Sequence, residues 1–410
     1  MKPFLSLLLL LLLAQVSFAN EPTIEELRAL GPAGLQILMA QYADEIRRHV
    51  ENPSAAPDEQ WQRISVALDT VAQQKNSYIS GLYWYTDLEA AKKASAESGN
   101  PILSLRLLGK LTDEFSCANS RFFRTVLYSN ADVSDYLREH YVLHWQSVRP
   151  VPKVTIDYGD GRKLERTLTG NSIHYILDST GRPIDAVPGL YGPTAFRRAL
   201  VDAEEMFKSI AGKDEQVRNS LLMRYYLAQS GKIAVAWKLD TTKIGGTPPA
   251  GLIIKKGTDD QALSISPLAV TKALTERPIL RAMTSTTEAL EKITDEAAWK
   301  KIAQLHASEA ILDERSIALI KRQNPTLADE ELARLLHRFQ EFIALDTMRN
   351  EYLMHSKLYT MLMRDPARND VEKLNEKVYA TIFLTPSSDP WLGLFSTDVY
   401  TALDNGGVVR

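Results

Sequence analysis

The alternation of helical patterns with short apolar runs between residues 77 and 212 constrains the fold more than any other feature. Asp87 precedes a helical pattern that stops at Gly99, since aspartate caps helix starts and glycine suits the left-handed conformation at helix ends. Residues 101–108 then form a short apolar run suited to a central strand. A loop, a second helix and a third short helix over 131–140 follow. These signals predict an α/β unit.

The rest of this segment contains strands that can pair through tight turns. Gly159-Asp160-Gly161 lies between two alternating runs, which is the pattern of a hairpin. The predicted elements are strands over 141–148, 171–177 and 183–187, a hairpin over 154–168 and a closing helix over 193–210. Parallel neighbours need helical crossovers, whereas the last two strands can meet directly. The order therefore predicts a mixed sheet with helices on both faces.

Helical patterns flank this unit on both sides. Residues 20–76 begin with a capping box, Thr23 with Glu26, and continue with apolar side chains at helical spacing. A helical pair and a linker rich in glycine and proline are expected over 213–264. Beyond them, residues 265–410 predict a helical C-terminal domain.

The amino terminus has the pattern of a secretory signal peptide. Lys2 precedes a leucine-rich stretch, and the small residues Ser17 and Ala19 mark a cleavage site, so residues 1–19 are the predicted signal. Its apolar stretch is shorter than the roughly 20 residues that span a bilayer, and no later segment is long enough. We therefore expect a periplasmic or secreted protein with no stable membrane span after signal removal.

The charge balance argues against nucleic acid as a partner. The 410 residues include 48 Lys and Arg against 51 Asp and Glu, and no basic block appears. Binding to a phosphate backbone needs a concentrated positive surface. Signatures of a phosphate-binding loop, a dinucleotide site, a serine hydrolase and a zinc protease are also absent from the sequence. We therefore predict neither a cofactor nor a metal.

Cys117 is the only cysteine of the chain. A single cysteine excludes an intramolecular disulfide, which leaves a buried thiol, a reactive thiol or one half of an intermolecular bridge. Composition alone favours the first alternative, because reduced cysteine is among the most buried residue types.

Short segments between residues 79 and 210 form a pattern known from one fold family. They include a tryptophan, a helix with two lysines, a strand start and a cysteine at a predicted helix start. The matching positions are Trp84 and residues 87–94, 99–103, 116–120, 129–133 and 141–143. Together they resemble a thioredoxin-like domain. The resemblance does not extend to the N-terminal helices or to the 200 residues after it.

The resemblance implies a chemistry for Cys117. Redox-active members carry C-x-x-C at a helix N-terminus, where backbone N–H groups and the helix dipole stabilise a thiolate. The first cysteine attacks a disulfide and the second resolves the mixed disulfide. Here Cys117 matches the attacking position and Ser120 the resolving one. The resemblance thus implies a monothiol with Cys117 as candidate nucleophile and Ser120 as its hydrogen-bond partner.

Two departures from the family pattern keep a second function open. Alignment on Gly181 places Ser172 or its neighbours where relatives have a proline, and Phe115-Ser116 replaces the usual tryptophan. Both indicate a fold that is retained while catalysis is relaxed. The chain is therefore expected either to exchange thiols with other exported proteins, as an oxidoreductase or isomerase would, or to be a redox-inactive binding or scaffold protein.

Histidines supply the remaining candidates. His144 and His174 lie on predicted strands and would act together only if they faced the same way. Three helical pairs place a histidine and a glutamate on one face: His306 with Glu309, His337 with Glu341, and Glu351 with His355. None has the Glu-x-x-His order of helical di-metal sites. Local hydrogen bonds and solvated helix faces are the preferred interpretations.

Overall fold

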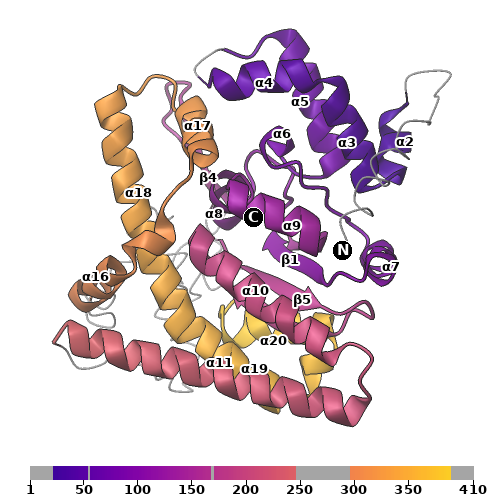
Figure 1. The fold of residues 1–410 in the computed structure, drawn as a ribbon. Helices are drawn as coiled ribbons and strands as arrows, with labels where there is room; N and C mark the ends of the chain where they lie inside the picture. The colour runs from indigo at the N-terminus through magenta and orange to yellow at the C-terminus, as the bar shows by residue number, and fades with distance from the viewer. Residues whose placement is uncertain (1–21, 54–55, 168–169, 246–295, 389–410) are drawn as a thin grey trace, which may run out of the picture.

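The computed structural model describes residues 22–53, 56–167, 170–245 and 296–388 (Figure 1). The predicted signal peptide and all but the first residue of the predicted linker after Ile244 lie outside the described residues. Within the described part of the chain, no helix combines the length and the apolar character that a bilayer crossing needs.

The described helices and strands fall into three consecutive groups. The N-terminal helices are α2 (Ile24–Ala29), α3 (Pro32–Gln41), α4 (Ala43–Glu51), α5 (Glu59–Ala72) and α6 (Ser77–Ser80). The sheet unit contains α7 (Leu88–Ser98), β1 (Ile102–Leu108), α8 (Ala118–Phe122), the π-helix η2 (Phe123–Leu127), α9 (Ala131–His140), β2 (Val142–Arg149), β3 (Lys153–Asp157), β4 (Lys163–Thr167), β5 (Ser172–Leu177), β6 (Pro183–Pro188) and α10 (Pro193–Ile210). The C-terminal helices are α11 (Glu215–Lys243), α16 (Glu296–Leu305), η5 (Ala307–Ala310), α17 (Glu314–Gln323), α18 (Asp329–Arg349), the π-helix η6 (Asn350–His355), α19 (Ser356–Arg364), η7 (Pro366–Asn369) and α20 (Val371–Thr381).

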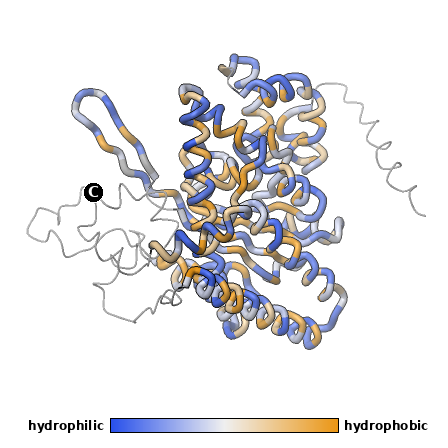
Figure 2. Tube along the Cα trace, turned by 60° about the vertical axis from the view of Figure 1, so that its left-hand side comes forward, coloured by the Kyte–Doolittle hydropathy of each residue, from blue (hydrophilic) through white to orange (hydrophobic). Residues whose placement is uncertain are grey.

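The central sheet has four strands in the order β2-β1-β5-β6. Strand β1 is parallel to β2 and antiparallel to β5, and β5 is antiparallel to β6. This arrangement confirms the predicted mixed sheet. Strands β3 and β4 pair only with each other and form the predicted hairpin, which projects from the body of the molecule in Figure 2.

Local capping signals set the bounds of the helices in the sheet unit. The Asn130 side chain accepts a hydrogen bond from the Val133 N–H at 3.1 Å, and Asp87 accepts one from the Glu89 N–H at 2.8 Å. Gly99 ends α7 with φ 75°, in the left-handed region that favours glycine. Helix α9 accordingly occupies the predicted range 131–140, and α10, which begins with a proline in its first turn, occupies the predicted range 193–210.

Helices cover both faces of the sheet. Every residue of β1 is buried. On one face, the ring of His174 packs at 4.9 Å from that of Phe196 on α10. On the other face, the Arg106 guanidinium donates to Glu372 at 2.6 Å, and the Tyr175 hydroxyl donates to Asn375 at 3.3 Å. Since Glu372 and Asn375 belong to α20, the last described helix is part of the covering of the sheet.

The N-terminal helices enclose a small core of their own. Leu27, Leu35, Trp61 and Leu68 belong to a buried cluster separate from that of the sheet. Helix α3 approaches α2 closely through Gly34, where an added Cβ would lie 1.9 Å from the Leu27 carbonyl oxygen. A glycine is required there by contact rather than by backbone angle.

The C-terminal helices share one core with the sheet. A single cluster of buried apolar side chains extends from Leu82 to Phe383. Hydrogen bonds join the same two parts: the Gly192 N–H donates to Thr347 Oγ1 at 2.8 Å, and Asn350 Nδ2 donates to the Leu190 carbonyl at 2.7 Å.

Helix α11 corrects one prediction. The helical pair expected after residue 213 is one continuous helix of 29 residues. Gly231 lies in its interior with open space around it, and a glycine there costs only about 1 kcal/mol relative to alanine. Buried Tyr226 and Ile233 on either side anchor the helix and outweigh that cost.

Candidate functional site

Cys117 lies at the start of helix α8, directly after the loop that follows β1. Its Sγ accepts a hydrogen bond from the Ser120 backbone N–H at 3.4 Å, so the sulfur caps the helix. The side chain is 0% exposed and belongs to the main apolar cluster. The predicted position at a helix start is confirmed, and of the three alternatives for the thiol the structure shows the buried one.

The Ser120 hydroxyl does not form the hydrogen bond to the sulfur that the resemblance implied. Its backbone N–H, and not its hydroxyl, donates to Cys117. The Ser120 hydroxyl is buried and makes no hydrogen bond within the described part of the chain. The reason is geometric: the N-cap side chain of a helix receives the N–H of the third residue beyond it, whatever side chain that residue carries.

Residues near the thiol come from three segments that are far apart in the sequence: 119, 171–172 and 379–385. Asn119 Nδ2 donates to Ser172 Oγ at 2.7 Å, and the Tyr379 hydroxyl donates to the Asn171 carbonyl at 3.0 Å. Asn171 Nδ2 in turn donates to Thr385 Oγ1 at 2.9 Å. Burial raises the pKa of the Tyr379 hydroxyl well above its usual range, and the nearby Cys117 sulfur adds to the rise. Helix α20 and the residues after it therefore lie beside the thiol.

His144 and His174 are not brought together. Across the sheet, His144 pairs with Ser104 of β1 whereas His174 pairs with Leu105. Adjacent strand residues point to opposite faces, so the two imidazoles lie on opposite sides of the sheet with β1 between their strands.

Each strand histidine has its own local partner. His144 Nδ1 lies 2.8 Å from Ser104 Oγ, and His174 Nε2 lies 2.7 Å from the Tyr128 hydroxyl. Burial lowers the pKa of His144 to about 3, with a further contribution from Arg106, and burial alone lowers that of His174 to about 3. Both are neutral at physiological pH, and within the described part of the chain His174 Nδ1 is buried without a hydrogen-bond partner.

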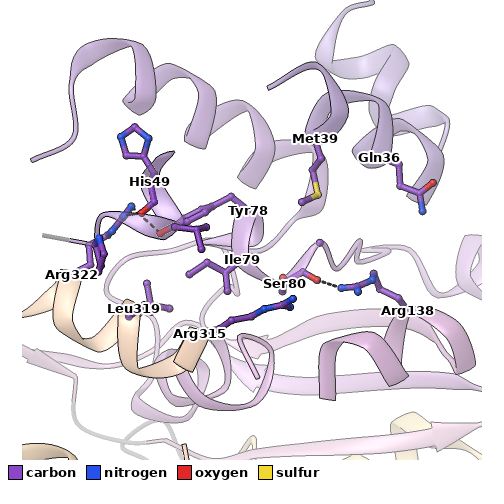
Figure 3. A pocket seen from close by; sticks show the side chains of 14 residues that line it. Gln36, Met39, His49, Tyr78, Ile79, Ser80, Arg138, Arg315, Leu319 and Arg322 are labelled. Carbon is purple, nitrogen blue, oxygen red and sulfur yellow. Dashed lines mark hydrogen bonds between the residues drawn. The ribbon is translucent and has the colours of Figure 1, made fainter. Parts of the chain in front are cut away.

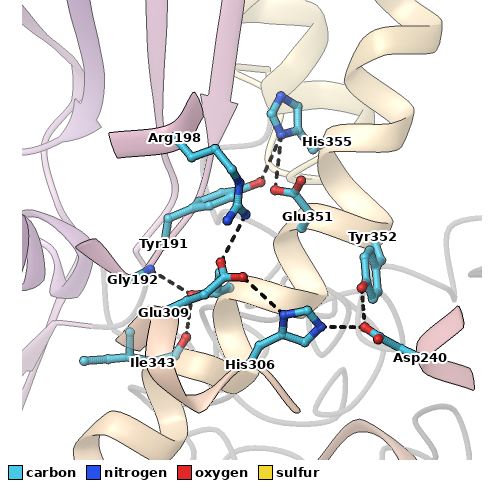
Figure 4. A network of polar contacts seen from close by, with 11 residues as sticks. Tyr191, Gly192, Arg198, Asp240, His306, Glu309, Ile343, Glu351, Tyr352 and His355 are labelled. Atoms are coloured by element: carbon cyan, nitrogen blue, oxygen red, sulfur yellow. Dashed lines mark hydrogen bonds and ion pairs between the residues drawn. The ribbon is translucent and has the colours of Figure 1, made fainter. Parts of the chain in front are cut away.

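Two of the three helical histidine pairs belong to a polar network between the sheet and the C-terminal helices, drawn in Figure 4. His306 lies between Glu309, at 3.2 Å from Nδ1, and Asp240, at 2.6 Å from Nε2. Arg198 of α10 donates to Glu309 at 3.0 Å, and the Tyr352 hydroxyl donates to Asp240. The hydrogen bond that the imidazole donates to Glu309 is the largest cause of a raised His306 pKa.

The second part of the network is centred on His355. Its Nδ1 lies 3.2 Å from the Tyr191 hydroxyl and 3.7 Å from Glu351, and its Nε2 lies 3.9 Å from Asp185. Burial opposes a charge on this imidazole, but the two carboxylates outweigh burial and raise the His355 pKa to about 9. His355 and Glu351 both lie on the π-helix η6, and such segments re-aim side chains within a long helix.

These positions correct the interpretation of the pairs as solvated helix faces. It holds for His337 and Glu341, whose side chains are 79% and 57% exposed. It is wrong for the other two pairs, because the sheet unit packs over them. Among the described residues, no group of three or more His, Cys, Asp or Glu side chains has an arrangement suited to a metal ion.

A cavity lined by arginines is a feature that sequence reasoning missed (Figure 3). It has a volume of about 420 Å³ and lies between the N-terminal helices, α9 and α17. Arg138, Arg315 and Arg322 line it. The one sequence signal was the seven-residue spacing of Arg315 and Arg322 on one helix, which places both on the same face.

No protein-family model, curated protein or solved structure matches this chain. Its function must therefore be inferred from its own geometry. Three regions supply that geometry: the buried thiol, the polar network and the arginine-lined cavity.

Proposed function

We propose that this chain is an exported thioredoxin-like binding protein whose single thiol is structural and does not exchange with disulfides. The observation that carries the proposal is the complete burial of Cys117 in the main core. A thiol must become a thiolate and reach its target to react, so a reactive cysteine needs at least partial exposure.

Two observations support the thioredoxin-like part of the proposal. The sheet is mixed and covered by helices on both faces, as the resemblance implies. Cys117 heads a helix that follows the central strand β1, which is where the resemblance places it. The predicted signal peptide supports export, and exported proteins are then the expected partners.

The contacts of Cys117 support a structural thiol. Its sulfur satisfies a backbone N–H of α8, a role that needs no ionisation. Ser120 cannot resolve a mixed disulfide, because a hydroxyl does not displace sulfur. Tyr379 and Thr385 hold Asn171, next to the Ser172 that bonds to α8, and the thiol itself is buried, so we expect a partner to bind at another surface.

Alkylation of the native protein tests the proposal. Cys117 should react with iodoacetamide at pH 7 only after unfolding in urea. The matched control is Cys117→Ala combined with Ser98→Cys, which places one thiol at an exposed position of α7 and should react at the rate of a free peptide thiol. Native labelling of the wild type at the control's rate would overturn the proposal.

Monothiol exchange is the second candidate, favoured by the position of Cys117 at a helix start. The N–H groups there would stabilise a thiolate if the covering residues moved away. Oxidant treatment followed by acid trapping distinguishes the two functions. A reductant-sensitive adduct that Cys117→Ala abolishes would establish exchange, and our proposal expects none.

A further inference from the structure

The arginine-lined cavity combines positive charge with apolar walls. Arg315 and Arg322 come from α17 and Arg138 from α9, and in Figure 3 Arg315 lies between the other two. Met39, Ile79 and Leu319 add apolar side chains to the lining, and no carboxylate is part of it. A concave site of this kind suits a ligand that has both a carbon skeleton and negative charge.

The charge of the cavity is only partly compensated by the protein. Asp135 is the carboxylate next to it, and it pairs with Arg138 and, at 4.0 Å, with Arg315. No ion pair of the described residues joins Arg322 to a carboxylate; it donates to backbone carbonyls of α4 and the residue after it, and to the Tyr78 hydroxyl. One carboxylate therefore faces three guanidinium groups.

Packing explains two of these arginines but not the third. Arg322 ties α17 to the end of α4, and Arg138 ties α9 to the Ser80 carbonyl. Among the described residues, Arg315 forms an ion pair with Asp135 alone, the loose one at 4.0 Å, and its side chain is 42% exposed. A guanidinium carries five N–H donors in a planar fork that matches carboxylate and phosphate oxygens.

We propose that this cavity binds a small organic anion carrying at least two carboxylate or phosphate groups. The volume of about 420 Å³ lies within the range of small-molecule sites and is too small for a folded partner. The apolar wall contacts the carbon skeleton, and Arg315 with its two neighbours binds the acidic groups. Cys117 is not part of the lining of this cavity.

Calorimetric titration of the purified chain at low ionic strength tests the site, with succinate, citrate and inorganic phosphate as probes. Arg315→Gln should lower the affinity for the probe that binds at least about tenfold, since a charge-assisted hydrogen bond is lost. The matched control is Arg334→Gln on α18, whose arginine is also exposed and also has one carboxylate contact at 4.0 Å. It should leave affinity unchanged. Tighter binding of a carboxylate probe than of phosphate would assign a carboxylate ligand, and the reverse order a phosphorylated one.

A second variant should raise the affinity for the probe. Asp135→Asn removes the carboxylate that competes for Arg138 and Arg315, so binding should tighten several-fold and weaken again as salt is raised. The Asp135→Asn measurement still tests the site if Arg315→Gln lowers the amount of folded protein. Absence of binding by all three probes up to millimolar concentration, or equal affinity in wild type, Arg315→Gln and Asp135→Asn, would overturn the proposal.

Discussion

At Cys117, sulfur takes the place that a hydroxyl or carboxylate usually has at a helix start. The Ser120 N–H that it satisfies is buried with it, and a buried donor without a partner costs about 1–3 kcal/mol. The cysteine is thereby accounted for by packing and capping together. Its position matches a family pattern without requiring the chemistry of that family.

Cys117→Ala should therefore lower the free energy of unfolding by about 1–2 kcal/mol, because it removes the cap and leaves a small void. The variant should remain folded and keep its partner. Urea denaturation measures the change. Under our proposed function, loss of partner binding without loss of stability is the outcome that contradicts a structural role.

Two glycines give a matched test of contact at the residue scale. Gly34→Ala would place a Cβ 1.9 Å from the Leu27 carbonyl oxygen, so α2 and α3 must separate, and we expect a loss of more than about 2 kcal/mol. Gly231→Ala meets open space inside α11 and should stabilise by about 0.5–1 kcal/mol. Thermal unfolding of both variants measures the difference. Equal effects would mean that helix propensity, and not the approach of α2, decides the role of Gly34.

At the scale of elements, α20 connects the thiol to the end of the described chain. Arg106 of β1 is buried and donates to Glu372, while Tyr379 donates to the Asn171 carbonyl. These contacts dock α20 on the sheet beside Cys117. The sequence separation between the partners is more than 200 residues, so the cover is a product of the tertiary fold alone.

Tyr379→Ala should expose the thiol without unfolding the chain. We expect the alkylation rate of Cys117 in the native protein to rise at least about tenfold, because the truncation removes a buried ring that covers the thiol. The lost packing should lower the free energy of unfolding by about 3–5 kcal/mol. Lys373→Ala, on the exposed side of the same helix, is the matched control and should change nothing. An unreactive thiol in a folded Tyr379→Ala protein would show that α20 is not its cover.

Local sequence signals predicted where the helices begin and end, but they did not predict what packs around them. Asn130 and Gly99 predicted helix bounds because a cap and a left-handed stop act within one turn. Composition favoured a buried thiol, but the cover over Cys117 was not predictable, because Tyr379 lies near it in the fold and far from it in the sequence. The arginine-lined cavity was not predicted for the same reason, since its walls come from three parts of the sequence.

On the scale of the whole molecule, buried histidines of opposite character lie within the sheet and at its junction with the C-terminal helices. His144 and His174 in the sheet have lowered pKa values of about 3. His355, at the boundary with the C-terminal helices, has a raised pKa of about 9. An ordinary histidine has a pKa of about 6.5, so folding keeps the first two neutral and the third charged.

These shifts predict a maximum of stability near pH 6.5. Below that pH, the unfolded chain binds protons that folded His144 and His174 refuse, so stability falls as the pH drops from about 6.5 toward 3. Above it, His355 holds a proton that the unfolded chain has released. The proton on His355 contributes on the order of 3 kcal/mol to the free energy of unfolding. This contribution is complete below about pH 6.5 and is lost as the pH rises through 9.

Melting temperatures measured between pH 5 and 10 should therefore form a dome. His355→Gln should lower the maximum and flatten the alkaline side, because the group that releases its proton there is gone. His337→Gln is the control, since that imidazole is largely exposed and should leave the profile unchanged. A wild-type profile that keeps rising from pH 6.5 to 9 would mean that His355 is neutral in the folded protein. The carboxylates of Asp185 and Glu351 would then repel one another across it, and the junction between sheet and helices would be held by packing and by the hydrogen bonds of Thr347 and Asn350.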